Sequence, residues 1–73
     1  MSQNGRIIDY LTRNGSITQL DAMRDLGIMR LGARVFDLKE RGYNIVTVMV
    51  EDLNRFGEPT RYARYYLKGA END

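Results

Sequence analysis

Hydrophobic residues follow a helical spacing in the first part of the chain. Over Gln3–Arg13, the apolar residues Ile7, Ile8 and Leu11 fall on one face of an amphipathic helix. Asn14-Gly15 follows, and both residues tolerate the left-handed conformation that ends many helices. The pattern therefore predicts a first helix that is closed at Gly15.

A second helix is predicted after a short extended link, Ser16–Thr18, which could begin a small strand. Thr18 is a suitable N-cap, and Asp21 stands three residues later, where its carboxylate can complete a capping box. The helix then covers Gln19–Leu26 and stops at Gly27. Its inward-facing side chains are expected to be Leu20, Met23 and Leu26.

A third helix is predicted over Met29–Arg41, with Ile28 filling the preceding turn and Gly42 closing the helix. Its apolar residues repeat at helical spacing. The buried stripe is expected to comprise Leu31, Val35 and Leu38, flanked by Phe36 or Met29. Two short helices joined by a tight turn are the arrangement in which many proteins present one helix to the DNA major groove.

The hydrophobic period changes after Gly42. A strand is predicted over Tyr43–Val50, which is rich in β-branched residues. Turn signals follow over Asp52–Pro59, and a second strand is predicted over Arg61–Leu67. The order of elements is that of an α+β winged helix-turn-helix, with three helices and a C-terminal β-hairpin wing. One domain over residues 1–68 and a flexible acidic tail over 69–73 are expected.

Composition narrows the classes of function. The chain has 73 residues, no cysteine and no histidine, so it lacks thiolate metal ligands and the commonest general base. It also lacks an apolar run of the roughly 20 residues that span a bilayer, and its start lacks the apolar core of a secretory signal. We expect a cytoplasmic protein that is not an enzyme and needs no cofactor, metal, membrane or small-molecule substrate.

The charge is unevenly distributed. The net charge is +1, but Glu71 and Asp73 lie in the tail, which leaves eight acidic and eleven basic residues over 1–68, a net of +3. Nine of the eleven bases are arginine, which suits bidentate contact with phosphate and guanine. This distribution is compatible with DNA binding and also with an ordinary mixed-charge surface.

The third helix carries the strongest candidates for DNA contact. Arg30 and Arg34 are predicted to enter the major groove near its start, Ala33 keeps the approach close, and Arg41 contacts the DNA backbone. Two structural alternatives remain open. Arg34 could form an i, i+3 ion pair with Asp37, and Arg41 could simply suit the negative end of the helix dipole. Asp37 itself is expected to be structural and could bridge helices.

The wing offers further candidates, of which Arg55 at the tip is the best placed for a minor groove or for phosphates. The other candidates on the hairpin are Asn54, Arg61 and Arg64. Acidic residues flank them, at Glu51, Asp52 and Glu58. Carboxylates so close to phosphate weaken the hypothesis of a DNA-binding wing and favour a protein partner there.

The hairpin is also predicted to have a second apolar face. Tyr62 and Tyr66 share one side of the last strand, opposite Ala63, Tyr65 and Leu67. Val46, Val48 and Val50 join that side if the two strands pair accordingly. Such a face suggests a homodimer or another protein partner, unless the first helix or the tail covers it.

A family resemblance rests on these motifs. The runs Ser16-Ile17-Thr18, Gly27–Leu38 and Arg41-Gly42-Tyr43, together with Ala63-Arg64-Tyr65, resemble the small winged helix-turn-helix proteins encoded by bacteriophages and prophages. The resemblance covers about residues 4–68. It implies binding to double-stranded DNA in a phage regulatory, architectural or packaging context, inside a bacterial host cell.

Overall fold

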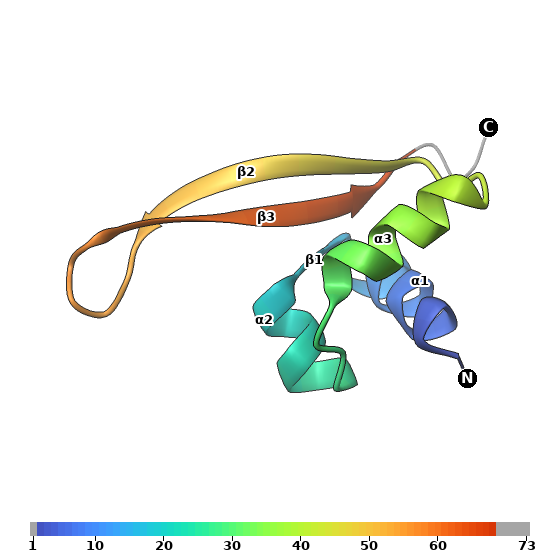
Figure 1. Ribbon diagram of the computed structural model, residues 1–73, viewed down its shortest axis with the longest axis horizontal. Coiled ribbons are helices and arrows are strands. Elements are labelled where there is room, and N and C mark those ends of the chain that lie inside the picture. Colours follow the sequence, from blue (N-terminus) through green and yellow to red (C-terminus); the bar gives the residue numbers. More distant parts are fainter. Residues whose placement is uncertain (1, 69–73) are drawn as a thin grey trace.

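A computed structural model describes residues 2–68, and the tail expected over 69–73 lies outside them. Helices and a small antiparallel sheet make up the α+β winged helix-turn-helix fold that the sequence predicted (Figure 1). The elements in chain order are α1 (Gln3–Asn14), β1 (Ser16–Thr18), α2 (Gln19–Asp21), the π-helix η1 (Ala22–Leu26), α3 (Leu31–Glu40), β2 (Ile45–Leu53) and β3 (Pro59–Leu67).

The three strands lie in the order β1-β3-β2, and every neighbouring pair is antiparallel. At the base of the hairpin, Ile17 of β1 pairs with Tyr65, and Ile45 of β2 pairs with Leu67. Figure 1 shows the helices gathered at this base, while the rest of the hairpin projects well beyond them. The helices and the base of the hairpin therefore share one core, and the outer hairpin is a true wing.

The core joins α1, η1, α3 and the base of the sheet. Its buried apolar residues are Ile7, Leu11, Ile17, Ala22, Ile28, Leu31, Val35, Leu38 and Ile45. The predicted stripe on the third helix is confirmed, as is the place of Ile28 in the turn, and Ile17 of β1 is also fully buried. β2 contributes only Ile45, at its first position, so packing fixes the root of the wing and leaves its outer part exposed.

The predicted interior of the second helix is wrong at two positions. Leu20 is 66% exposed and Met23 is 44% exposed, whereas Ala22 is fully buried and Leu26 packs against the core. The prediction assumed a regular α-helix. Instead the chain forms a π-helix over Ala22–Leu26, where the Gly27 amide donates to the Ala22 carbonyl five residues earlier. This widening changes which side chains face inward.

The third helix starts later than predicted, at Leu31 instead of Met29, and ends at Glu40. Arg30 is its N-cap residue, with non-helical backbone angles (φ −123°, ψ 67°). Met29 and Phe36, expected to flank the buried stripe, are 71% and 66% exposed. The side of α3 that enters the core consists of Leu31, Val35 and Leu38, and Phe36 lies off this stripe, while Met29 precedes the helix.

The hairpin strands extend further than predicted. The ladder continues through Glu51↔Arg61 to Leu53↔Pro59, so polar residues that read as turn signals lie within the strands. Cross-strand pairing of opposite charges supports such an extension. The turn is reduced to the short loop between Leu53 and Pro59, in which Gly57 has a positive φ of 75°.

Asp25 links η1 to α1 and makes stability depend on pH. Its carboxylate accepts hydrogen bonds from Arg24 at 2.9 Å and from Tyr10 at 2.8 Å. These bonds, the Arg24 bond foremost, lower the pKa of Asp25 from 3.8 to about 2. A carboxyl group whose pKa is lower in the folded state stabilises the fold above its unfolded pKa. That contribution is lost as the pH falls through the folded value.

We therefore expect stability to decline between about pH 4 and pH 2, in part through Asp25. In the variant Asp25→Asn, this part of the decline should be missing, and stability at pH 7 should be lower than in the parent. Thermal unfolding followed by circular dichroism at pH 7, 4 and 2.5 measures both effects. A parent and a variant with parallel pH profiles would contradict this role for Asp25.

Candidate nucleic-acid interface

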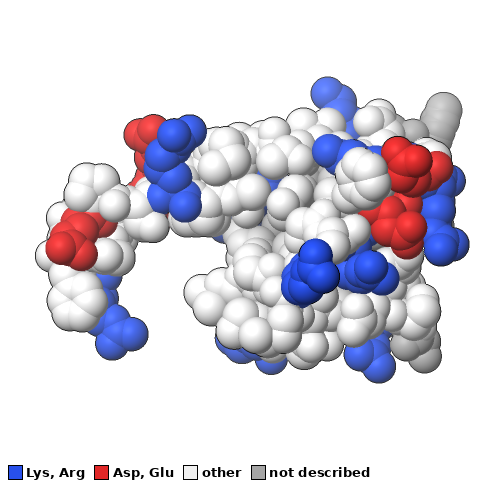
Figure 2. Space-filling model, viewed as in Figure 1, with Lys and Arg blue, Asp and Glu red and all other residues white. Residues whose placement is uncertain are grey.

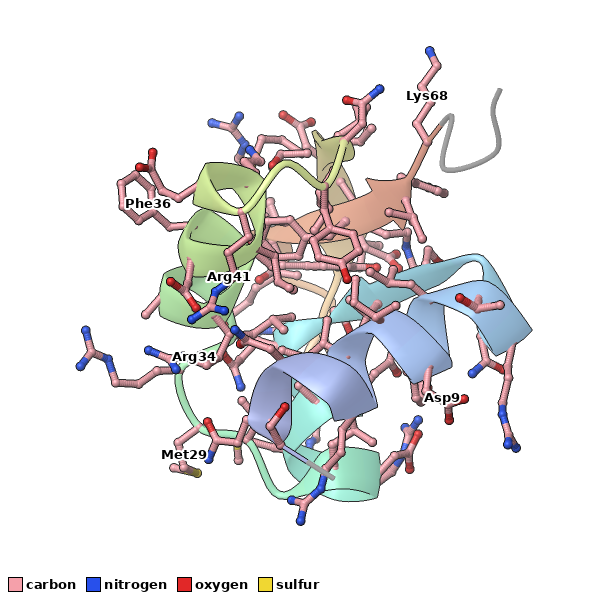
Figure 3. All side chains as sticks on the ribbon, turned by 90° about the vertical axis from the view of Figure 1, so that its right-hand side faces the viewer. Asp9, Met29, Arg34, Phe36, Arg41 and Lys68 are labelled. Carbon is pink, nitrogen blue, oxygen red and sulfur yellow. The ribbon has the colours of Figure 1, made fainter. Side chains whose placement is uncertain are left out.

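Three of the predicted contact residues meet at the start of α3. Arg30, Ala33 and Arg34 line one shallow hollow, which is completed by Gln3, Gly27 and Met29. Arg30 is exposed and Arg34 is half-buried. In Figure 3, Met29, Arg34 and Phe36 project from the same outer side of the molecule. This side of α3 is therefore available to a ligand, opposite the stripe that enters the core.

Most arginines are occupied by partners within the described chain, 2–68. The occupied pairs are Arg13–Asp9, Arg24 with Asp21 and Asp25, Arg41–Asp37, Arg61–Glu51 and Arg64–Ser16. Over the same residues, no side-chain hydrogen bond or ion pair is found for Arg6, Arg30, Arg34 or Arg55. The start of α3 thus carries two guanidinium groups whose donors are free for an external acceptor.

Arg41 lies at the other end of α3 and belongs to a different cluster. Its Nε donates to Asp37 Oδ2 at 3.1 Å, and Asn4 Nδ2 of α1 donates to the same oxygen at 2.6 Å. The bond from Asn4, followed by that from Arg41, holds the pKa of Asp37 below its usual range. The prediction that Asp37 is a structural residue bridging helices is confirmed, and Arg41, not Arg34, is its ion-pair partner.

Gln19 determines the geometry of the turn, a role that the sequence reasoning missed. Its side-chain amide donates to the Ile28 carbonyl at 2.8 Å, and its carbonyl oxygen accepts from the Leu31 amide at 2.8 Å. One side chain therefore fixes both sides of the link between η1 and α3, and it satisfies an amide that the N-terminus of α3 leaves unpaired. Thr18 and Asp21 form the predicted capping box. A glutamine directly after an N-cap threonine was the only sequence signal of this clamp.

The wing tip is an ordered loop built by Asn54. Its Oδ1 accepts from the amides of Phe56 at 2.9 Å and Glu58 at 3.0 Å, and its Nδ2 donates to the Glu58 carboxylate at 3.2 Å. The side chain proposed for DNA contact is therefore engaged within the loop. Arg55 stands at the tip, with its guanidinium 5.8 Å from the centre of the Phe56 ring. Phe56 is 76% exposed, so the tip presents a cation beside an aromatic ring.

The two remaining candidates lie on opposite faces of β3. Arg61 is 64% exposed and lies opposite Glu51, with 3.6 Å between Arg61 Nε and Glu51 Oε2. Arg64 is half-buried and donates to the Ser16 hydroxyl at 3.0 Å. Arg64 lines a hollow between β3 and the start of α2. Neither residue lies in the hollow beside Arg30 and Arg34.

Charge distinguishes the start of α3 from the wing. Figure 2 shows basic side chains where α3 begins, acidic ones over its second half, and both signs along the wing. The described part of the wing carries Glu51, Asp52 and Glu58 against Arg55 and Arg61, so its formal charge is −1. The positive potential of the helix N-terminus adds to that of Arg30 and Arg34. The start of α3 is thus the better place for phosphate.

The predicted second face of the hairpin exists. Val46 pairs with Tyr66, Val48 with Arg64 and Val50 with Tyr62, so these side chains share one face. Val48 is 44% exposed and Tyr66 is 39% exposed, while the other apolar members are half-buried. The first helix therefore does not cover this face completely.

Neither a membrane-spanning helix nor a metal site is found among residues 2–68. Over residues 2–68, no helix is long and apolar enough to cross a membrane. Acidic side chains in that part of the chain do not gather in a group that could hold a metal ion.

A helical pair with a tight turn, followed by a β-hairpin wing, defines the class of winged helix-turn-helix proteins. The family model described as "Winged helix-turn-helix domain" matches residues 2–70, so the chain belongs to this family. Membership implies DNA binding in general. A search of curated proteins gives no match.

Proposed function

We propose that this protein binds double-stranded DNA with the segment 29–41 in the major groove and the wing, 51–61, on the adjacent backbone or minor groove. The resemblance to phage and prophage domains leads us to propose a regulatory or DNA-architecture role in a bacterial cytoplasm. The protein acts in this proposal as a binding module without catalysis.

One observation carries the proposal: Arg30 and Arg34 have no acidic partner within residues 2–68, while Arg41 on the same helix is paired. Free guanidinium groups are suited to guanine edges and phosphates. Their position at the positive end of α3 favours an anionic ligand further. In this proposal Arg30 and Arg34 make the main contacts, Ala33 allows close approach, and Arg41 acts at the backbone.

The wing has the reach for a second contact. β2 runs beyond the helices (Figure 1), and its last five residues, Met49–Leu53, span about 14 Å at the rise of an extended strand. The major groove is about 12 Å wide. The two lengths are comparable, which supports a contact of the wing with the neighbouring phosphates or minor groove when α3 is docked. Arg55 is the contact proposed there, with Arg61 and Arg64 nearer the hairpin base and Asn54 holding the loop in shape.

A second candidate function is a protein-interaction module. Two observations favour it: the formal charge of −1 on the wing, and the partly exposed valine and tyrosine face of the hairpin. In this alternative the hairpin docks on a host or phage protein. Charge on α3 would then be incidental to binding.

Salt dependence separates the two functions. A DNA complex that neutralises several phosphates loses affinity steeply as salt rises, by about 0.9 in log affinity per phosphate for each tenfold increase in salt. For random duplex, we expect the slope of log affinity against log salt concentration to correspond to about three or more neutralised phosphates. Gel-shift or anisotropy titrations at several salt concentrations, on random duplex and on DNA flanking the gene itself, measure this slope. No binding to either DNA at low salt would overturn the proposal.

A further inference from the structure

The outer edge of β2 has no partner strand within the described chain. In the sheet order β1-β3-β2, β2 is terminal, and Figure 1 shows no helix lying along its outer side. An unpaired strand edge presents a row of amide and carbonyl groups that can pair with another strand. Many natural edge strands are very short, which limits such pairing, whereas β2 is nine residues long.

The hydrogen-bond pattern identifies which residues face outward. Two backbone hydrogen bonds flank β2 and set the alternation. Lys68 N donates to the carbonyl of Asn44, the residue before β2, and Asn54 N, of the residue after β2, donates to Glu58 O. Residue pairs in an antiparallel ladder alternate between hydrogen-bonded and non-hydrogen-bonded pairs. The backbone N–H and C=O groups of even-numbered residues in β2 therefore bond to β3, and those of odd-numbered residues point toward the free edge. Pro59, which has no amide proton, lies opposite odd-numbered Leu53, as this alternation requires. The outward-facing groups thus belong to Ile45, Thr47, Met49, Glu51 and Leu53, of which the Leu53 amide already donates to Asp52 Oδ1 at 2.8 Å.

The edge lacks the usual protection against pairing. The run Val46–Val50 contains no charge, proline or glycine, and Val48 and Met49 are 44% and 51% exposed. Acidic residues begin only at Glu51. Natural edge strands commonly carry lysine, proline or a bulge in their centre. The centre of β2 is therefore suited to a partner strand.

The sequence of this run also indicates which strand would fit. In an antiparallel pair of two copies of β2, only a twofold axis at Val48 places the whole run Val46–Val50 opposite itself. Val46 then meets Val50 of the second copy, and Thr47 meets Met49. A shift of the axis to Met49 would instead place Val46 opposite Asp52. The register at Val48 also keeps the acidic residues of the two copies apart.

We propose that two copies of this chain associate through β2, antiparallel about Val48, and so form one continuous six-stranded sheet. Outward groups of Thr47 and Met49 exchange hydrogen bonds between the copies, and the valines pack as a ladder flanked by Tyr62 and Tyr66. The twofold axis runs perpendicular to the sheet. Both helical units consequently lie on the same face of that sheet, and the two wings point in opposite directions.

This association is independent of DNA and goes beyond the proposed function. The absence of cysteine from the chain makes a direct test available. Val48 forms a non-hydrogen-bonded pair with its own copy, for which the Cα separation is about 4.5 Å, within the range that a disulfide spans. The variant Val48→Cys should therefore form a covalent dimer in near-complete yield under mild oxidation. The single variant Val46→Cys should not, since Val46 faces Val50.

A mixture of Val46→Cys with Val50→Cys tests the register, because it should yield the mixed disulfide in preference to either homodimer. Sedimentation of the parent should show a dimer that Val48→Lys converts to a folded monomer. Phe56→Lys, at an exposed residue outside the run, is the matched control and should remain dimeric. A parent that stays monomeric, or equal cross-linking of Val46→Cys and Val48→Cys, would overturn the proposal. DNA binding by the monomer would survive either result.

Discussion

The double variant Arg30→Ala/Arg34→Ala is expected to lose most of its affinity for DNA while keeping its fold. Each arginine contact with a base or phosphate contributes about 1–3 kcal/mol, so loss of both weakens binding by about 30-fold or more. Neither side chain has an ion-pair partner within residues 2–68, so their removal breaks no ion pair there. Anisotropy titration at one fixed salt concentration measures the loss, and circular dichroism verifies the fold.

The matched control is Arg13→Ala/Arg24→Ala. It lowers the net charge by the same amount but removes arginines that are paired with Asp9, Asp21 and Asp25. We expect a much smaller loss of affinity than for the α3 variant, together with a shallow decrease in stability. If the two double variants weaken binding equally, total charge and not the start of α3 governs the interaction.

Leu31→Ala is expected to cause the largest loss of stability. Leu31 is fully buried, and truncation of a buried leucine costs about 2–5 kcal/mol in a small domain whose whole stability is of similar size. The midpoint of thermal unfolding should fall by about 10 °C or more. Differential scanning calorimetry or thermal circular dichroism at neutral pH provides the measurement.

Leu20→Ala is the companion to this variant, because the same change is made at a leucine that is 66% exposed. Its expected cost is within about 0.5 kcal/mol. The pair also tests the corrected interior of the second helix, since the sequence pattern predicted both leucines to be buried. Equal losses from the two truncations would mean that Leu20 is packed against the core.

The order of helices and strands could be predicted because it depends on local signals. The left-handed glycines at Gly15 and Gly27, the capping box at Thr18 and the β-branched run after Gly42 each determine the structure of their own neighbourhood. The interior of the second helix could not be predicted in the same way. A π-helical widening at Ala22 depends on how that segment packs against α1 and the turn, and the spacing of hydrophobic residues does not encode it.

The sequence could predict which basic residues lie at the candidate interface, but it could not predict which of them are free of partners within the fold. It placed Arg30 and Arg34 as groove contacts and Arg41 as a backbone contact. Only the structure shows that Arg41 is paired with Asp37. Asn4, which donates to the same carboxylate, lies thirty-three positions before Asp37 in the chain. The roles of Gln19 and Asn54 depend likewise on backbone groups that folding brings close to them.

The Gln19 clamp has a consequence for any measurement of DNA binding. A glutamine amide carries no charge and does not titrate, so its two bonds across the turn respond little to ionic strength or acidity, unlike the carboxylate pairs elsewhere on the surface. The link between η1 and α3 is therefore less sensitive to salt and acidity than the Asp37–Arg41 ion pair at the other end of α3. Under the proposed function, the turn that holds Arg30 and Arg34 in place would thus keep its two Gln19 bonds over the salt range of a titration, so a change of affinity with salt would report mainly on charge.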